Sequence, residues 1–312
     1  MHVLVTGGAG FIGSHLTDAL LDRGDEVSVV DDLSSGRLTR LNPRIALHKV
    51  SVTSASALAG IVQRARPEVI FHLAAQVDVR ASVAAPGRDA DINVGGTVKV
   101  LEAAQATGVP VIFASTGGAM YGMNASVPSP ENLLPVPEAP YGTAKYCAEQ
   151  YIGLYNRMHG ARHAILRLGN VYGPRQDPNG EAGVVAIFCG SVLRCGQVTV
   201  YGDGTQTRDY VYVGDVVSAL LAAAEADRPG LWNIGTGIET SVLELVDLVG
   251  HVAGRSVGPR FAGARAGELQ RSALDVTRAA NELGWKATTP LAAGIGKVWG
   301  WVQDGENDTA FC

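Results

Sequence analysis

Tyr141 and Lys145 are the residues of this chain whose types and spacing are best suited to acid–base chemistry. They lie four residues apart in Tyr141-Gly142-Thr143-Ala144-Lys145, within a segment, residues 140–158, whose pattern predicts a helix. Residues four apart share a helix face, so the lysine ammonium can stabilise a phenolate and bring the tyrosine pKa from about 10 toward neutrality. Such a phenolate accepts the proton of an alcohol whose carbon loses a hydride. The spacing alone is common, and a surface tyrosine beside an extended lysine is the alternative interpretation.

A glycine-rich turn near the N-terminus indicates the partner for such chemistry. An apolar strand, residues 2–6, leads into Gly7-Gly8-Ala9-Gly10-Phe11-Ile12-Gly13, and an amphipathic helix follows to about residue 23. The spacing of Gly8, Gly10 and Gly13 fits the dinucleotide fingerprint. In that fingerprint, glycines let the backbone approach a pyrophosphate, and the helix N-terminus presents N–H donors to the phosphates. The sequence therefore predicts a bound dinucleotide.

Asp31 indicates which dinucleotide is bound. It ends a second buried strand, residues 27–30, and lies 18 residues after Gly13. A carboxylate at this place accepts hydrogen bonds from the adenosine ribose and repels a 2′-phosphate, and no arginine stands beside it. These features favour NAD over NADP, with a helix or turn cap as the alternative role for Asp31.

The first half of the chain alternates strands with helices. Such alternation predicts an α/β fold of the Rossmann type, with a doubly wound parallel sheet covered by helices on both faces. We expect residues 1–169 to form this NAD-binding domain, with return segments near 208–235, and residues 170–312 to form mainly a smaller C-terminal α/β lobe for the substrate. Further strands are expected at 68–73, 110–114 and 163–168, further helices at 55–65, 94–107 and 184–195, and a substrate-covering loop at 174–183.

The composition argues against several classes of function. The chain has 312 residues, 46% of them hydrophobic and 18% charged, as in globular proteins. Its net charge of −5 gives no reason to expect nucleic acid or an anionic membrane as a partner. No apolar run is long enough to span a bilayer and no signal peptide is recognisable, so we expect a cytoplasmic location. The four cysteines lack metal-ligand spacing, and no metal site is expected.

A series of motifs extends along nearly the whole chain. In chain order they are Thr6-Gly-Gly-Ala-Gly-Phe-Ile-Gly13, Val30-Asp-Asp-Leu-Ser34, His72-Leu-Ala-Ala-Gln76, Asn93, Tyr121-Gly122, Tyr141–Lys145, Arg167-Leu-Gly-Asn-Val-Tyr-Gly-Pro174, Arg208-Asp-Tyr-Val-Tyr-Val213 and Leu283-Gly-Trp285. With these motifs the sequence resembles the extended short-chain dehydrogenase/reductases. Within them it looks like the NAD-dependent nucleotide-sugar epimerases.

The resemblance implies a set of NAD contacts. Tyr141 would be the catalytic base, while Lys145 would hold the nicotinamide ribose and lower the tyrosine pKa. The segment Leu73-Ala74-Ala75 would line the cofactor beside its riboses, and Asn93 would lie near its pyrophosphate. The full expected set is Gly7, Gly10, Phe11, Ile12, Asp31, Asp32, Ser34, Leu73, Ala74, Ala75, Asn93, Tyr141 and Lys145.

The resemblance likewise implies a site for a UDP-sugar. Asn170 would contact the sugar diphosphate, and Arg208 and Arg265 would contact its phosphates. Glu268 would lie near the uridine ribose, and Val200-Tyr201 would pack against the uracil. A loop-capping asparagine and solvated surface arginines are the alternatives. The full expected set is Gln76, Thr116, Asn170, Val184, Val200, Tyr201, Arg208, Arg265 and Glu268.

Three positions depart from the family pattern. Ser51 stands where the family usually has an aspartate that binds the adenine amino group, and Ser272, which is small, would leave room for an N-acetyl group on the hexose. Gly117 falls at the usual place of the catalytic hydroxyl. We assign that role to the neighbouring Thr116, with Ser115 second and direct contact between Tyr141 and the substrate as a further alternative.

The segment Gly117-Gly118-Ala119 also narrows the reaction. It has no ionisable side chain, whereas related dehydratases carry Asp-Glu there and a decarboxylating relative carries Glu, so elimination lacks its proton carriers. The reaction that remains is C4 epimerisation of a UDP-hexose, UDP-glucose or UDP-galactose, through a transient 4-keto sugar and bound NADH. Alternatives are UDP-glucuronate or a UDP-N-acetylhexosamine as substrate, or a dehydratase, reductase or non-enzymatic NAD-binding protein of this fold. Helices 94–107 and 140–158 pair two subunits in many relatives, so a homodimer is expected.

Overall fold

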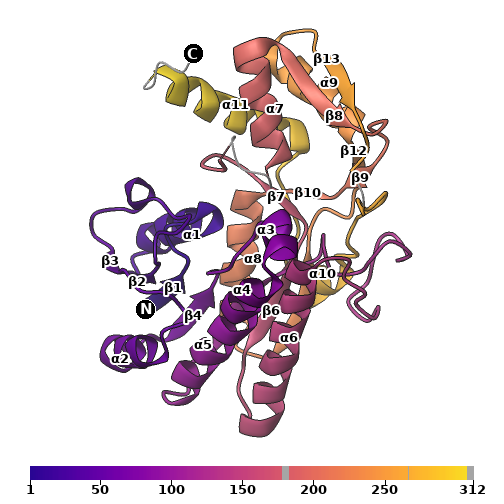
Figure 1. The fold of residues 1–312 in the computed structure, drawn as a ribbon. Helices are drawn as coiled ribbons and strands as arrows, with labels where there is room; N and C mark the ends of the chain where they lie inside the picture. The colour runs from indigo at the N-terminus through magenta and orange to yellow at the C-terminus, as the bar shows by residue number, and fades with distance from the viewer. Residues whose placement is uncertain (178–182, 266, 308–312) are drawn as a thin grey trace.

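A seven-stranded parallel sheet with helices on both faces organises the chain (Figure 1). The structure is a computed structural model, and it describes residues 1–177, 183–265 and 267–307. The strand order is β11-β6-β5-β4-β1-β2-β3. The strands are β1 (His2–Thr6), β2 (Glu26–Val30), β3 (Ala46–His48), β4 (Val69–His72), β5 (Val111–Thr116), β6 (Ala164–Leu168) and β11 (Gly230–Ile234). The expected doubly wound parallel α/β fold is confirmed.

Two separate apolar cores hold the helices against the sheet. On one face, Leu16 and Leu20 of α1 (Phe11–Asp22) pack with α8 (Val213–Glu225) and α10 (Thr277–Leu283). On the other face lie α2 (Ala55–Ala65), α5 (Gly96–Gln105) and α6 (Pro140–His159). The central strands are buried on both faces, which explains why they read as continuous apolar runs rather than as alternating patterns.

The segment between β4 and α5 differs from the sequence expectation. The helix expected at 94–107 is present as α5 (Gly96–Gln105), but three unpredicted elements precede it: α3 (Val79–Ala84), α4 (Pro86–Ala90) and a π-helical turn, η2 (Asp91–Gly95). Pro86 starts α4 because proline lacks the N–H that a helix interior requires and is accepted in the first turn. This short-helix segment carries Asp89 and Asn93 to the end of β4.

A second lobe lies at the carboxyl end of the sheet. Its helices are α7 (Val184–Cys195), α9 (Val242–Ala253) and α11 (Leu291–Asn307), which share their own apolar core. Its strand pairs are β7 (Asn170–Tyr172) with β10 (Tyr210–Tyr212), β8 (Gln197–Tyr201) with β13 (Gly258–Ala262), and β9 (Thr207–Arg208) with β12 (Thr240–Ser241). The chain enters this lobe after β6 and returns to form β11 beside β6. Part of the expected loop 174–183, residues 178–182, lies outside the described residues.

Candidate active site

Tyr141 lies in the first turn of α6, directly against the turn that follows β5. Gly142 makes this approach possible, since a Cβ there would lie 2.4 Å from the carbonyl oxygen of Ala119. Thr116 ends β5, and its Oγ1 accepts a hydrogen bond of 3.2 Å from the backbone N–H of Ala119. The helix start and the strand end thus bring the Tyr141 phenol and the Thr116 hydroxyl together.

The electrostatics of Tyr141 differ from the sequence expectation. Burial raises the pKa of its phenol to about 12, the charge of Asp89 raises it further, and only the contact with Thr116 lowers it. Lys145, which was expected to lower this pKa, is not among the groups that do so. The Lys145 ammonium donates a 2.9 Å hydrogen bond to the Ala114 carbonyl and lies 4.6 Å from the ring centroid of Phe113. The Lys145 ammonium thus binds the backbone of β5.

Lys145 is itself a perturbed group. Burial lowers the pKa of its ammonium to about 8, and two carboxylates, Asp89 and Glu149, oppose this shift. Its side chain is buried between α6 and the sheet. A lysine whose pKa lies this close to neutrality is typical of functional sites. In such sites burial lowers the pKa of the ammonium, and a nearby carboxylate partly offsets that shift.

The geometry separates Thr116 from Ser115 as the catalytic hydroxyl. The Ser115 Oγ donates a 2.6 Å hydrogen bond to Glu149 Oε1 in the buried interior, so this hydroxyl is already committed. Gly117, at the family's usual hydroxyl position, has no room for a side chain, because a Cβ there would lie 2.6 Å from Cδ1 of Leu274. Of the two candidate hydroxyls, that of Thr116 is the one in contact with Tyr141.

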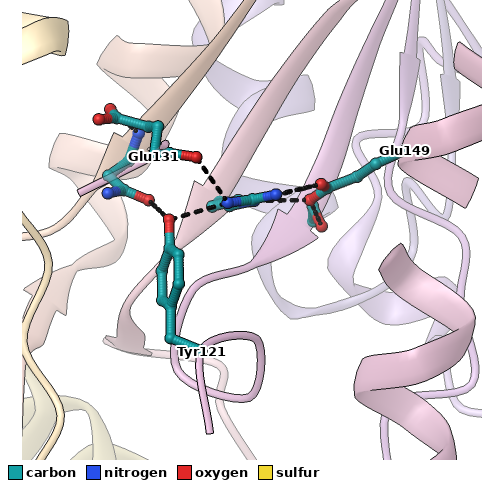
Figure 2. Close-up of polar contacts among 6 residues, drawn as sticks. Tyr121, Glu131 and Glu149 are labelled. Atoms are coloured by element: carbon teal, nitrogen blue, oxygen red, sulfur yellow. Dashed lines mark hydrogen bonds and ion pairs between the residues drawn. The ribbon is translucent and has the colours of Figure 1, made fainter. Parts of the chain in front are cut away.

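A buried polar network lies immediately behind this strand end (Figure 2). Arg167 of β6 donates from Nε and Nη2 to Glu149 of α6, at 3.0 and 2.6 Å for the shortest contacts. Its Nη1 donates to the Tyr121 hydroxyl at 2.9 Å, and that hydroxyl donates to Asn233 Oδ1 at 2.8 Å. The network joins β5, β6, β11 and α6 at the edge where the reacting groups lie.

The glycine-rich turn is shaped by close contacts. Gly7 has a φ of 73°, and a Cβ there would lie 2.6 Å from the Ala74 backbone nitrogen. A Cβ on Gly13 would lie 2.1 Å from the Gly7 carbonyl oxygen, whereas Gly10 meets only that same oxygen, at 3.1 Å. Gly7 and Gly13 therefore allow the chain to fold tightly at this turn, whereas Gly10 leaves the outer side of the turn open. An N-terminus of this shape at the start of α1 fits a pyrophosphate.

Asp31 anchors that turn. Its carboxylate accepts hydrogen bonds from the backbone N–H groups of Ala9, at 2.9 Å, and Leu33, at 2.8 Å. Burial raises the pKa of this carboxyl, while the two backbone donors lower it. Asp31 is thus placed at the carboxyl end of β2, next to the glycine turn, where the fingerprint requires it. Asp32 accepts from the Ser34 N–H at 2.9 Å and orders the same segment.

Gln76, Asn93 and Asp89 form a clamp on the segment after β4. The Asn93 amide exchanges two 3.0 Å hydrogen bonds with the Gln76 backbone, and Asp89 Oδ1 accepts from both the Gln76 and the Asn93 side chains. The remaining amide contacts of Gln76 go to the backbone of Asp78. The Gln76 side chain, expected to bind substrate, is therefore fully engaged in holding the segment that contains Leu73, Ala74 and Ala75.

The expected substrate residues line the junction with the second lobe. Asn170 begins β7, and its Oδ1 would lie 3.1 Å from a Cβ on Gly118, so it faces the catalytic turn. Arg208 is held by the carbonyls of Thr207 and Leu269, at 2.7 and 2.8 Å, and more weakly by Glu268 at 3.4 Å.

The outer end of this junction is capped by an aromatic contact. The guanidinium of Arg265 lies over the Tyr201 ring, 4.0 Å from its centroid. Val200 is fully buried beside Tyr201 at the end of β8. Val184 begins α7 and lines a small cavity with Asn170. The structure thus brings Arg208 and Glu268 together, and Arg265 with Tyr201.

Known proteins share this sequence and fold. The model of the NAD dependent epimerase/dehydratase family matches residues 3–235. The chain is also 44% identical over 305 residues to the UDP-glucose 4-epimerase of Mycolicibacterium smegmatis, with 96% of this chain and 97% of that protein covered. The chain belongs to the NAD dependent epimerase/dehydratase family. The resemblance seen in the sequence is confirmed, and this protein is an NAD-dependent enzyme.

Two solved structures show how closely this epimerase/dehydratase follows its relatives. One is the UDP-glucose 4-epimerase of Thermotoga maritima with UDP-glucose, at a TM-score of 0.95 and 44% identity, covering 98% of this chain and 99% of that one. The other is the UDP-glucose 4-epimerase of Thermus thermophilus with NAD, at a TM-score of 0.90 and 38% identity, covering 97% and 99%.

Sequence reasoning overlooked one charged group of this epimerase/dehydratase. Asp89 is buried, its charge acts on both Tyr141 and Lys145, and its Oδ2 has no hydrogen-bond partner among the described residues. The available signal was its spacing, because Asp89 lies four residues before Asn93 and so shares a helix face with it. The helix expected from the sequence begins at residue 94 and includes neither residue.

The structure adds detail at the other departures from the family pattern. The Ser51 hydroxyl contacts the Thr53 hydroxyl at 3.0 Å, and Ser272 is buried.

Among residues 1–177, 183–265 and 267–307, no three His, Cys, Asp or Glu side chains are grouped as metal ligands. Within the same described part, no helix is long and apolar enough to cross a membrane.

Proposed function

We propose that this protein interconverts UDP-glucose and UDP-galactose by inversion at C4. The observation that carries the proposal is the turn after Thr116, where Gly117 and Gly118 leave no acid or base and Leu274 fills the space beside Gly117. Dehydration of the same sugar would need further proton carriers beside the hexose. The 44% identity to relatives named UDP-glucose 4-epimerase, over nearly the full length, supports the same reaction.

The chain's own residues have distinct tasks in this reaction. The Tyr141 phenolate accepts the 4-OH proton and later returns it, with Thr116 bridging the phenol and the sugar oxygen. The redox chemistry at C4, removal and return of a hydride, would be supplied by NAD when it is bound. Because burial raises the pKa of Tyr141 to about 12, the phenol is protonated at neutral pH, and the phenolate has to be stabilised during the reaction.

Inversion also requires the 4-keto sugar to turn while its diphosphate stays fixed. Arg208 suits this anchoring because it is buried and already held in place by two backbone carbonyls. A guanidinium binds phosphate oxygens in a fixed geometry. Gly7, Gly10 and Asp31 are proposed to hold the cofactor, together with the segment that Asn93 fixes.

The test is epimerisation without added cofactor. The purified protein is incubated with UDP-glucose, UDP-glucuronate or UDP-N-acetylglucosamine, and C4 epimers are followed by NMR. We expect UDP-galactose from UDP-glucose. Tyr141→Phe should abolish turnover, whereas Tyr155→Phe, a control on the same helix, should not. A 4-keto-6-deoxy product, net release of reduced cofactor or near-normal turnover by Tyr141→Phe would overturn the proposal.

We also propose that two copies pair through α3 and α6. Apolar side chains are exposed on both helices: Tyr151, Leu154 and Met158 on α6, and Val83 on α3, with Val83 and Met158 being 63% and 64% exposed. Tyr151, Leu154 and Met158 share one face of α6. Light scattering should give twice the chain mass, and Leu154→Arg should give the monomer without unfolding it. A monomeric wild type at micromolar concentration would refute this pairing.

A further inference from the structure

Tyr210 and Gln176 carry polar atoms that lack partners in one small cavity. In the described part of the chain, the Tyr210 hydroxyl and Gln176 Oε1 are buried without a hydrogen bond, and the two residues are only 4% and 9% exposed. The cavity has a volume of about 10 Å³ and is also lined by Asn170 and Val184. That volume accommodates a single oxygen-sized group. Buried polar groups without partners are rare, because each costs its full desolvation energy.

Tyr210 is placed between the two ends of the proposed substrate site. Side chains alternate along an extended chain, so Arg208 and Tyr210 point to one side and Asp209 to the other. Asp209 accordingly accepts hydrogen bonds from Thr236 and neighbouring backbone groups. In the parallel pair of β10 with β7, Tyr210 lies opposite Asn170, on the same face. The hydroxyl therefore lies between Asn170, which faces the catalytic turn, and Arg208.

The charges around Tyr210 favour an anionic ligand. Burial raises the pKa of its phenol to about 12, so the hydroxyl is a donor throughout the physiological range. The nearby Arg208 acts on the same hydroxyl with its positive charge, and the negative charge of Glu268 opposes it. A neutral donor beside a guanidinium is suited to an oxygen that already carries negative charge, since hydrogen bonds to charged acceptors are the stronger ones.

We propose that the Tyr210 hydroxyl donates a hydrogen bond to an oxygen of the sugar nucleotide's diphosphate, beside Arg208. This inference rests on the proposed function, which supplies the diphosphate. It adds a neutral donor to the arginines that the sequence indicated. The competing interpretation is a structural water that bridges the Tyr210 hydroxyl and Gln176 Oε1, which the same experiment tests.

The experiment measures binding of UDP, UDP-glucose and uridine to the NAD-loaded protein by calorimetry and competition. Tyr210→Phe should weaken UDP and UDP-glucose by about tenfold or more, the usual effect of losing a hydrogen bond to a charged group. Uridine, which has no phosphate, should bind within about twofold of wild type. Tyr172→Phe is the matched control, because Tyr172 also lines the cavity but its hydroxyl already has a partner, the Leu291 carbonyl at 3.4 Å.

A second variant guards against a folding defect. Gln176→Glu is nearly isosteric and places a negative charge in the cavity, at the loss of the 3.1 Å hydrogen bond to the Val171 carbonyl, so it should weaken UDP while leaving uridine unchanged. Unchanged UDP affinity in Tyr210→Phe together with a lower melting temperature would establish the structural water and overturn the proposal. Equal weakening of uridine and UDP would also overturn it. Binding of UDP by a wild type that does not epimerise would refute the proposed function alone and leave this test intact.

Discussion

Removing one member of the Arg167–Glu149 pair should destabilise the protein strongly. Both side chains are almost fully buried, 3% and 1% exposed, and two hydrogen bonds of 3.0 Å or less join them. Breaking such a pair leaves an uncompensated buried charge, which costs about 3–5 kcal/mol. Arg167→Met and Glu149→Leu should each lower the free energy of unfolding by this amount.

The double variant separates the pair from its surroundings. It removes both charges, leaves the Ser115 hydroxyl without its acceptor and leaves the Tyr121 hydroxyl without the Arg167 donor, so it should cost roughly 1–3 kcal/mol rather than the sum of the single changes. Urea unfolding of the four proteins measures these differences. Arg278→Met, in an exposed helix pair, is the control and should cost less than about 0.5 kcal/mol. Single variants within about 1 kcal/mol of wild type, or a double variant that costs their sum, would refute the reasoning.

Three further predictions concern single groups. Asp89→Asn removes a charge that raises the pKa of Lys145, so the ammonium should lose its proton at lower pH. The alkaline limb of the kcat/KM profile should therefore shift to lower pH, and an unchanged limb would contradict this. Thr116→Val should lower kcat about 100-fold in steady-state assays, whereas Ser115→Ala should keep kcat within a few fold but lower stability. The reverse pattern would assign the catalytic hydroxyl to Ser115. Ser241→Ala removes the capping box of α9 and should cost about 1 kcal/mol in urea unfolding, with no cost arguing against the cap.

Local patterns predicted the strands and the cofactor turn well. Residues 2–6 and 27–30 are apolar runs bounded by glycine or aspartate, and such runs are informative because both faces of a parallel strand are buried. The short helices before α5 were not predicted, because Pro86 and Gly87 interrupt the helical pattern there.

The electrostatics could not be predicted from spacing. The lysine four residues after Tyr141 was expected to lower the tyrosine pKa, yet burial raises that pKa and the ammonium donates its hydrogen bond to a carbonyl of β5. Desolvation depends on how many distant segments cover a group, and spacing along a helix contains no such information. The choice between Ser115 and Thr116 likewise depended on a partner 34 residues away.

Because β11 pairs with β6, the central sheet can be completed only after the segment between these two strands has been synthesised. Residues 169–229, which include α7 and the strands around Arg208, leave the ribosome before β11 can pair with β6. Until then β6 is an open edge that exposes unpaired backbone groups. The nucleotide-binding sheet therefore cannot close before the first part of the second lobe, including α7, has been synthesised. A fragment ending near residue 169 should aggregate rather than fold as an independent domain.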